Sequence, residues 1–259
     1  RSRASRAPAS GPRPCASTPA LASYALMGLQ TVRTVTTVND DGPGSLRQAI
    51  ANSAPGDSIQ FALTLPAAIE LSNTLFIAAD LSVLGPGPDQ LTVMRSDAPC
   101  TPNFRVFEIE SGVVTLAGIT IRNGSAFSGT NIHDNLGGGI LNRGNLTVSN
   151  CVIRGNSAPT TDWGTNVPDP NFRFSRGFGA GIFSNWGQLA VVNSTITGNQ
   201  ATAAGGGICT FETEPFFAQG CTVNDNFAAM QGGGLNFQGR VGTLQNCTVA
   251  DNATAADGA

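Results

Sequence analysis

One eight-residue pattern occurs four times, as SNCVIRGN at 149–156, VNSTITGN at 192–199, QGCTVNDN at 219–226 and QNCTVADN at 245–252. A looser version, AGITIRNG, lies at 117–124. A glycine turn recurs between these copies, as GGGI at 137–140, GAGI at 179–182, GGGI at 205–208 and GGGL at 232–235. Internal repetition of this kind is the sequence signature of a solenoid.

The period of the repeat indicates which solenoid this is. Ile196 and Val223 are 27 residues apart, and Val223 and Val249 are 26 apart. Such a unit is too short for a globular subdomain and too rich in glycine and β-branched residues for a pair of helices. It fits one coil of a β-helix, in which short strands joined by turns stack on the preceding coil. We therefore predict an all-β, single-stranded, right-handed parallel β-helix.

Residues one period apart should then lie above one another, because stacked coils are spaced like neighbouring strands, at about 4.8 Å. We predict two inward aliphatic stacks, which bury apolar area continuously, and one asparagine column that forms a ladder of side-chain hydrogen bonds. The first stack is Ile153, Ile196, Val223 and Val249; the second is Ile140, Ile182, Ile208 and Leu235; the column is Asn156, Asn199, Asn226 and Asn252.

The two ends of the predicted solenoid differ. Residues 44–50, GSLRQAI, predict a short helix that covers the first coil, with Ser45 as its N-cap and Gln48 completing a capping box. The other end stops partway through a repeat, so we expect either a natural chain that continues or an end that stacks on a partner. We divide the chain into a leader or disordered segment at 1–30, an N-terminal cap with the first coils at 31–110, and regular coils at 111–259, incomplete at the C-terminus.

The beginning of the solenoid resembles a known motif. DGPGSLRQAI at 41–50, followed by PGDSIQF at 55–61, is similar to the CSLREA motif of bacterial surface β-helix proteins, with Gly44 where that motif has Cys. The later Asn-Cys-Thr and Gly-Gly-Gly-Ile units resemble the repeats of polymorphic outer-membrane and choice-of-anchor proteins. The resemblance covers about residues 34–259. It implies an exported protein with an adhesive or structural role outside the cell or at its surface.

Composition argues against several classes of function. All 14 basic residues are Arg, which excludes Schiff-base chemistry on Lys. The net charge is −3 and no basic patch follows the leader, so a nucleic-acid partner is not expected. Six Cys form no CxxC pair and His133 is the only His, so no zinc site of the usual spacing is present. No apolar run approaches the ~20 residues of a membrane span.

One coil carries an insertion within 158–177, because Ile153 and Ile196 are 43 residues apart. Loops on a rigid scaffold often carry function. We predict contact with a carbohydrate or protein through this insertion and through the turn after Ile208; the alternative is that the aromatic residues pack back over the coil. The predicted contact residues are Trp163, Phe172, Arg173, Phe174, Arg176, Phe211, Glu212 and Glu214.

Two columns raise a question of chemistry. Asp225 and Asp251 occupy one column, where two carboxylates one coil apart repel by ~3 kcal/mol at an effective dielectric near 20. Either a cation such as Ca²⁺ lies between them, or they splay into solvent. Cys221 and Cys247 share another column with Cys151, and we expect free stacked thiols rather than a disulfide.

Two functional hypotheses follow. The first is a non-catalytic structural or adhesive surface protein that contacts copies of itself, through end-to-end stacking of coils, or cell-surface glycans. The second is a polysaccharide-active lyase or hydrolase. The Gly-His-Gly and Arg-Ile-Lys motifs of β-helix hydrolases are missing, and no nucleophile elbow is present. We assign no catalytic residue and no cofactor other than a candidate Ca²⁺, and we favour the first hypothesis.

Overall fold

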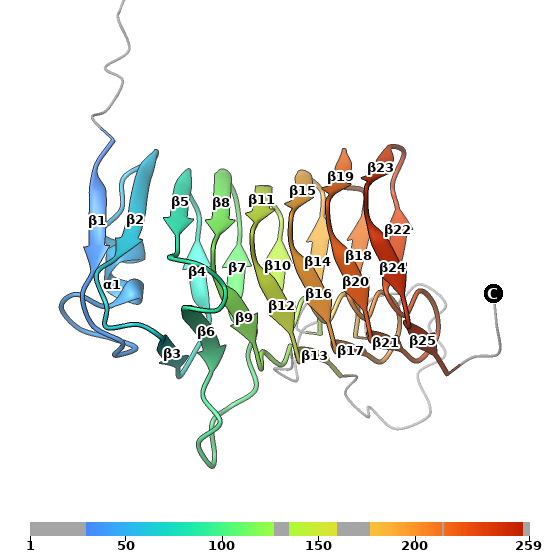
Figure 1. The fold of residues 1–259 in the computed structure, drawn as a ribbon, viewed down its shortest axis with the longest axis horizontal. Helices are drawn as coiled ribbons and strands as arrows, with labels where there is room; N and C mark the ends of the chain where they lie inside the picture. Colours follow the sequence, from blue (N-terminus) through green and yellow to red (C-terminus); the bar gives the residue numbers. More distant parts are fainter. Residues whose placement is uncertain (1–29, 127–134, 160–176, 214, 256–259) are drawn as a thin grey trace, which may run out of the picture.

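The computed structural model describes residues 30–126, 135–159, 177–213 and 215–255. In this part the chain winds into a row of coils, drawn from the N-terminal end in blue to the C-terminal end in red in Figure 1. Each strand lies parallel to the equivalent strand of the next coil, and the stacked strands form four sheets. The predicted parallel β-helix is confirmed, and so is its short helix near the N-terminus.

Three of the sheets extend along the whole described solenoid, and the fourth is confined to its later coils. Sheet A contains β1 (Val32–Val35), β2 (Asp57–Phe61), β5 (Leu81–Leu84), β8 (Val113–Ala117), β11 (Asn145–Ser149), β15 (Gln188–Val192), β19 (Phe216–Gln219) and β23 (Gly242–Gln245). Sheet B contains β3 (Ala67–Leu71), β6 (Leu91–Arg95), β9 (Thr120–Arg122), β12 (Val152–Arg154), β16 (Thr195–Thr197), β20 (Thr222–Asn224) and β24 (Thr248–Ala250). Sheet C contains β4 (Leu75–Ile77), β7 (Phe107–Ile109), β10 (Ile140–Asn142), β14 (Ile182–Asn185), β18 (Ile208–Phe211) and β22 (Leu235–Gln238). Sheet D contains β13 (Ser157–Ala158), β17 (Gln200–Ala201), β21 (Phe227–Ala228) and β25 (Ala253–Thr254).

Both predicted aliphatic stacks are confirmed by the strand register. Sheet B pairs Ile153, Ile196, Val223 and Val249 in one row. Sheet C pairs Ile140, Ile182, Ile208 and Leu235 in another. Side chains alternate between the two faces of a strand, so every second residue of β8, β11 and β15 reaches the common core.

The asparagine column is a hydrogen-bonded ladder. The Nδ2 of Asn156 donates to Oδ1 of Asn199 at 3.0 Å, Asn199 donates to Asn226 at 2.9 Å, and Asn226 donates to Asn252 at 3.0 Å. The same Oδ1 atoms also accept from the backbone N–H groups of Asn156, Asn199 and Asn226. Every rung therefore points the same way: amide donors face the C-terminal end of the solenoid and amide oxygens face the N-terminal end.

The left-handed backbone position of this turn is one residue earlier than the column. It is occupied by Gly155, Gly198, Asp225 and Asp251, with φ of 60°, 63°, 53° and 54°. Asparagine tolerates such angles, but the ladder asparagines themselves do not adopt them. Burial and hydrogen bonding account for these asparagines, and conformational tolerance accounts for the Gly and Asp that precede them.

A helix, α1 (Leu46–Ala51), covers the first coil as predicted. It contacts β1 and β4, and Leu46 is completely buried in the common core. The hydroxyl of Ser45 accepts from the backbone N–H of Gln48 at 3.1 Å, and the Gln48 side chain accepts from the N–H of Gly44 at 3.1 Å. Gly44 has a φ of 81°, and a Cβ there would overlap Thr36 Oγ1, which explains glycine at the position where the CSLREA motif has Cys.

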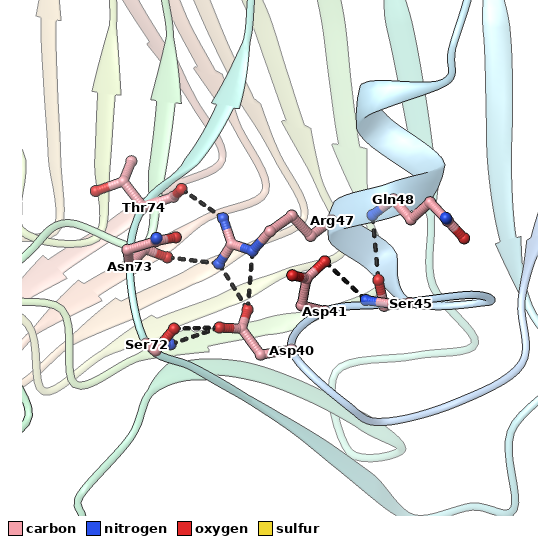
Figure 2. A network of polar contacts seen from close by, with 9 residues as sticks. Asp40, Asp41, Ser45, Arg47, Gln48, Ser72, Asn73 and Thr74 are labelled. Atoms are coloured by element: carbon pink, nitrogen blue, oxygen red, sulfur yellow. Dashed lines mark hydrogen bonds and ion pairs between the residues drawn. The ribbon is translucent and has the colours of Figure 1, made fainter.

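Figure 2 shows how this cap is fastened to the solenoid. The guanidinium of Arg47 donates to the Asp40 carboxylate at 2.6 and 3.1 Å, and to the carbonyl oxygens of Asn73 and Thr74 at 2.8 Å each. The second Asp40 oxygen accepts from the backbone N–H of Ser72 at 2.9 Å and from its hydroxyl. Burial raises the pKa of Asp40, but the hydrogen bonds from Ser72 and Arg47 outweigh it and hold that pKa below its ordinary value.

The last described coil is less buried than the coil before it. Val249 and Leu244 occupy inward rows, yet they are 47% and 50% exposed, whereas Val223 and Ala218 in the preceding coil are 3% exposed each. Phe237 packs against Phe216, with ring centroids 6.0 Å apart, and covers only part of this surface. In the described part of the chain, the first coil is thus covered by α1, and the last coil leaves Leu244 and Val249 exposed.

Candidate functional site

The turns that join sheet C to sheet A carry the most unusual side chain on the surface. Trp186 and Gly187 form the turn between β14 and β15, with φ of 58° and 56°. Glycine fits here because a Cβ on residue 187 would overlap the Gly144 carbonyl of the neighbouring turn. Trp186 gains no such benefit, because a left-handed backbone costs a residue with a Cβ roughly 1–2 kcal/mol.

Trp186 is held in place by the next coil. Its indole Nε1 donates to Oε2 of Glu212 at 2.7 Å, and its backbone N–H donates to the carbonyl of Phe211 at 3.1 Å. A hydrogen bond to a carboxylate is short and strong compared with a neutral one. The indole is still 54% exposed, so a rigidly oriented aromatic surface faces solvent beside an exposed carboxylate.

An orphaned polar atom lies next to this pair. Asn185 precedes Trp186 and pairs with Phe211 across sheet C. Its Oδ1 is buried and accepts no hydrogen bond from the described residues. Buried acceptors without a donor are uncommon in proteins.

One coil earlier, the same edge carries compensated charge. Arg143 lies 2.8 Å from a Glu108 oxygen and 2.7 Å from a Glu110 oxygen, and Arg105 lies 2.6 Å from the other Glu108 oxygen. Burial raises the pKa of Glu108, but Arg105 and Arg143 more than offset this and lower that pKa overall. The two Arg and two Glu side chains of these ion pairs neutralise one another, so we interpret this cluster as structural.

The outer face of sheet C is apolar. Phe178 and Phe183 pack with ring centroids 6.4 Å apart, and Phe211 is half-buried against the same cluster. The buried members of this cluster are Leu136, Leu141, Phe183 and Cys209. Of the predicted contact residues, Phe211 therefore lies where the packing alternative placed it, while Glu212 is exposed beside Trp186.

The structure does not test the other predicted contact residues. They lie outside the described residues, as does His133: Trp163, Phe172, Arg173, Phe174, Arg176 and Glu214. Sequence reasoning missed Trp186 altogether. A signal was available, because NWGQ at 185–188 follows the same turn pattern as NRGN at 142–145, with an aromatic residue in place of Arg.

Asp225 and Asp251 are stacked, since the preceding residues Asn224 and Ala250 pair in register. Both carboxylates are exposed, and Asp225 accepts a hydrogen bond from the Asn224 side chain. Among the described residues no three His, Cys, Asp or Glu lie close enough together to hold a metal ion. Calcium at this column stays a prediction.

The expected free thiols are present. Cys151, Cys209, Cys221 and Cys247 are unpaired. Burial raises the pKa of Cys209 to about 12 and that of Cys151 to about 11. Cys151 and Cys209 therefore behave as small apolar core residues and are poor nucleophiles.

No family model and no curated protein matches the chain. In the part of the chain that the structure describes, the single helix is far too short to cross a membrane.

Proposed function

We propose that this chain is a non-catalytic structural or adhesive protein of the cell exterior, and that it binds glycans through Trp186 and Glu212. The observation that carries the proposal is the exposed indole fixed by the Glu212 carboxylate. The resemblance of residues 41–61 to surface β-helix proteins agrees with a location outside the cell.

The chemistry of the pair suits a sugar. A pyranose ring has an apolar face of C–H groups, which packs on an aromatic plane, and hydroxyl groups, which donate to a carboxylate. The Oε2 atom of Glu212 is taken by the indole, which leaves Oε1 free of hydrogen bonds from the described residues. Because the indole is already oriented, little side-chain freedom is lost on binding.

The backbone supports the same conclusion. A position with φ near 58° favours Gly, Asn or Asp, and the equivalent position of the next coil is held by Glu212, with a φ of 50°, so both residues of the pair have this costly backbone. A bulky residue that persists in a costly conformation motivates a hypothesis of function. Trp186 is too exposed to gain the packing energy of a buried tryptophan, so we attribute its presence to contact with a ligand.

The test is binding of the purified chain to a panel of immobilised neutral and acidic polysaccharides. We expect binding to at least one member, and a loss of about tenfold or more in Trp186→Asn, because asparagine keeps the turn and removes the ring. Glu212→Gln keeps an acceptor for the indole and should lose less. Arg143→Ala, on the neighbouring turn, serves as the control and should bind normally. Absence of wild-type binding across the panel, or equal binding by Trp186→Asn, would overturn the glycan assignment.

A further inference from the structure

Two arginines are stacked on the outer face of sheet B. Arg122 is the last residue of β9 and Arg154 the last of β12, and the two pair in register on adjacent coils. Arg154 is exposed and Arg122 is half-buried. Neither guanidinium forms an ion pair or a hydrogen bond with any described residue. Two like charges in register repel each other, so this pair favours an anionic partner.

The same face carries the opposite charge further along the solenoid. Asp225 and Asp251 directly follow the residues of β20 and β24 that continue the row of Arg122 and Arg154. Both carboxylates are exposed, Asp225 although a further coil follows it. The other outward positions of β9, β12, β16, β20 and β24 are uncharged. They are Thr120, Val152, Thr195, Thr197, Thr222, Asn224, Thr248 and Ala250.

These charges are arranged symmetrically about β16. The strands β9, β12, β16, β20 and β24 lie side by side in this order (Figure 1). Arg122 and Asp251 are each two coils from β16, or about 10 Å along the solenoid axis, and Arg154 and Asp225 are each one coil from it. Opposite charges at equal distances from a centre make a surface complementary to itself.

We infer that the outer face of sheet B binds the same face of a second copy of this chain, with the two solenoids antiparallel. The two-fold axis then lies along β16, so Arg154 faces the partner's Asp225 and Arg122 faces the partner's Asp251. Each Asp is offset from its Arg by one residue along the strand, about 3.3 Å, which a long arginine side chain spans. Every contact occurs twice, as in any isologous interface.

Charge also selects the orientation. If the two solenoids were parallel, Arg122 and Arg154 would face their own copies, and like charges across an interface are unfavourable. In the antiparallel arrangement only Thr195 and Thr197 meet their own copies, and both are uncharged. The Thr120 hydroxyl donates to the carbonyl of Pro88 at 2.8 Å, so the partner's β24 contacts this turn rather than Thr120.

Sedimentation of the full chain at high micromolar concentration tests the inference. The face is only five short strands wide, so we expect a weak monomer–dimer equilibrium at low ionic strength, with a dissociation constant at least fivefold larger in about 0.5 M salt. Arg154→Gln should raise the dissociation constant about fivefold or more, because each dimer loses two ion pairs. Arg240→Gln makes the same change of charge on the turn after β22 and should leave it unaltered. A chain that stays monomeric at both salt concentrations, or equal weakening by the two variants, would overturn the inference.

Two charge-inverted variants provide a second test. Arg122→Glu combined with Arg154→Glu makes both ends of the face negative, and Asp225→Lys combined with Asp251→Lys makes both ends positive. Neither should dimerise alone, but an equimolar mixture should form a heterodimer at least as tight as the wild-type dimer. Circular dichroism checks that each variant is folded, and a monomeric mixture of two folded variants would contradict the proposed pairing.

Lysine is costly at the left-handed positions of Asp225 and Asp251, with φ of 53° and 54°. If that variant does not fold, the comparison of Arg154→Gln with Arg240→Gln still decides. Trp186 lies on the turn between sheets C and A, outside this face, so both tests are independent of the glycan proposal.

Discussion

Trp186 and Glu212 lie on adjacent coils, and the indole Nε1 of the first donates to the carboxylate of the second at 2.7 Å. Their backbones are stacked as well, because each residue donates its N–H to the coil that follows, Trp186 to Phe211 and Glu212 to Gln238. A side-chain contact that bridges two coils can therefore be removed without breaking the sheet beneath it, and this makes the pair accessible to substitution.

Substitution at Trp186 should separate binding from stability. Trp186→Asn is expected to keep stability or raise it by about 0.5–1 kcal/mol, because asparagine tolerates φ near 58°. Trp186→Val should lower stability by about 1 kcal/mol or more, because a β-branched residue fits this region worst. Urea unfolding measures both. If Asn were as destabilising as Val, the indole would be a packing residue and the backbone argument would fail.

The asparagine ladder should be most sensitive at its centre. Asn199→Ala removes the acceptor of the Asn156 backbone and side-chain donors, both buried, so we expect a loss of about 3 kcal/mol or more. Asn252→Ala should cost only about 1 kcal/mol, because Asn252 is half-buried and water can replace it as the acceptor of the Asn226 donors. The free energy of unfolding, measured with urea, distinguishes the two, and equal losses would contradict a ladder that depends on burial.

Low pH should destabilise the protein, partly because it protonates Asp40 in the cap. The folded-state pKa of Asp40 lies below its ordinary value of 3.8, so its contribution is complete above that pH and is lost as the pH falls through the folded value. Glu108 behaves alike, from an ordinary value of 4.5. We expect thermal midpoints that are level above about pH 5 and decline below it. Asp40→Asn should flatten part of this decline; an unchanged acid slope would show that the contacts of Asp40 contribute little.

Thiol labelling should follow burial. Cys100 is exposed and should react with iodoacetamide at pH 8 in the folded protein. Cys209 and Cys151, with pKa values raised to about 12 and about 11, should react only after unfolding. Peptide mapping by mass spectrometry reads each site separately. Labelling of Cys209 at the rate of Cys100 would mean that the outer cluster on sheet C opens readily.

Substitution of Asp225 should show whether the stacked carboxylates of Asp225 and Asp251 repel each other or bind a metal ion. Without a cation, Asp225→Asn should raise stability slightly at low ionic strength, by up to about 0.5 kcal/mol, because the substitution removes one of two like charges and keeps a residue suited to φ near 53°. The gain should vanish in about 1 M salt, where charges are screened within about 3 Å. With Ca²⁺ present, a loss of stability in the variant, and heat on calcium titration of the wild type, would instead indicate a site.

The sequence was sufficient for the solenoid because its rows repeat at one period. Ile196, Val223 and Val249 are aligned by a spacing that any coil must share, so their stacking followed from counting residues. The ladder followed for the same reason, and the cap followed from the local chemistry of Ser45 and Gln48.

The candidate site was predicted only in part because it does not repeat. Glu212 was singled out by its aromatic neighbours, but its partner Trp186 comes from the preceding coil and has no counterpart in the other turns. The predicted stack of Ile182 on Ile208 already places Trp186 beside Glu212, because both pairs are 26 residues apart, but the sequence does not show that the indole turns toward the carboxylate. Phe211 was misleading for a related reason, since alternation along β18 directs it to the outer apolar cluster.

The two ends of the described solenoid should differ in how easily they unfold. Each coil touches only its two neighbours, so loss of structure spreads most easily from a coil that has a neighbour on one side alone. Among the described coils, the one formed by β22 to β25 is paired on one side alone, whereas α1 and its Arg47 contacts close the opposite end. With this sequence, unfolding under mechanical load or mild heating should therefore begin at β22 to β25.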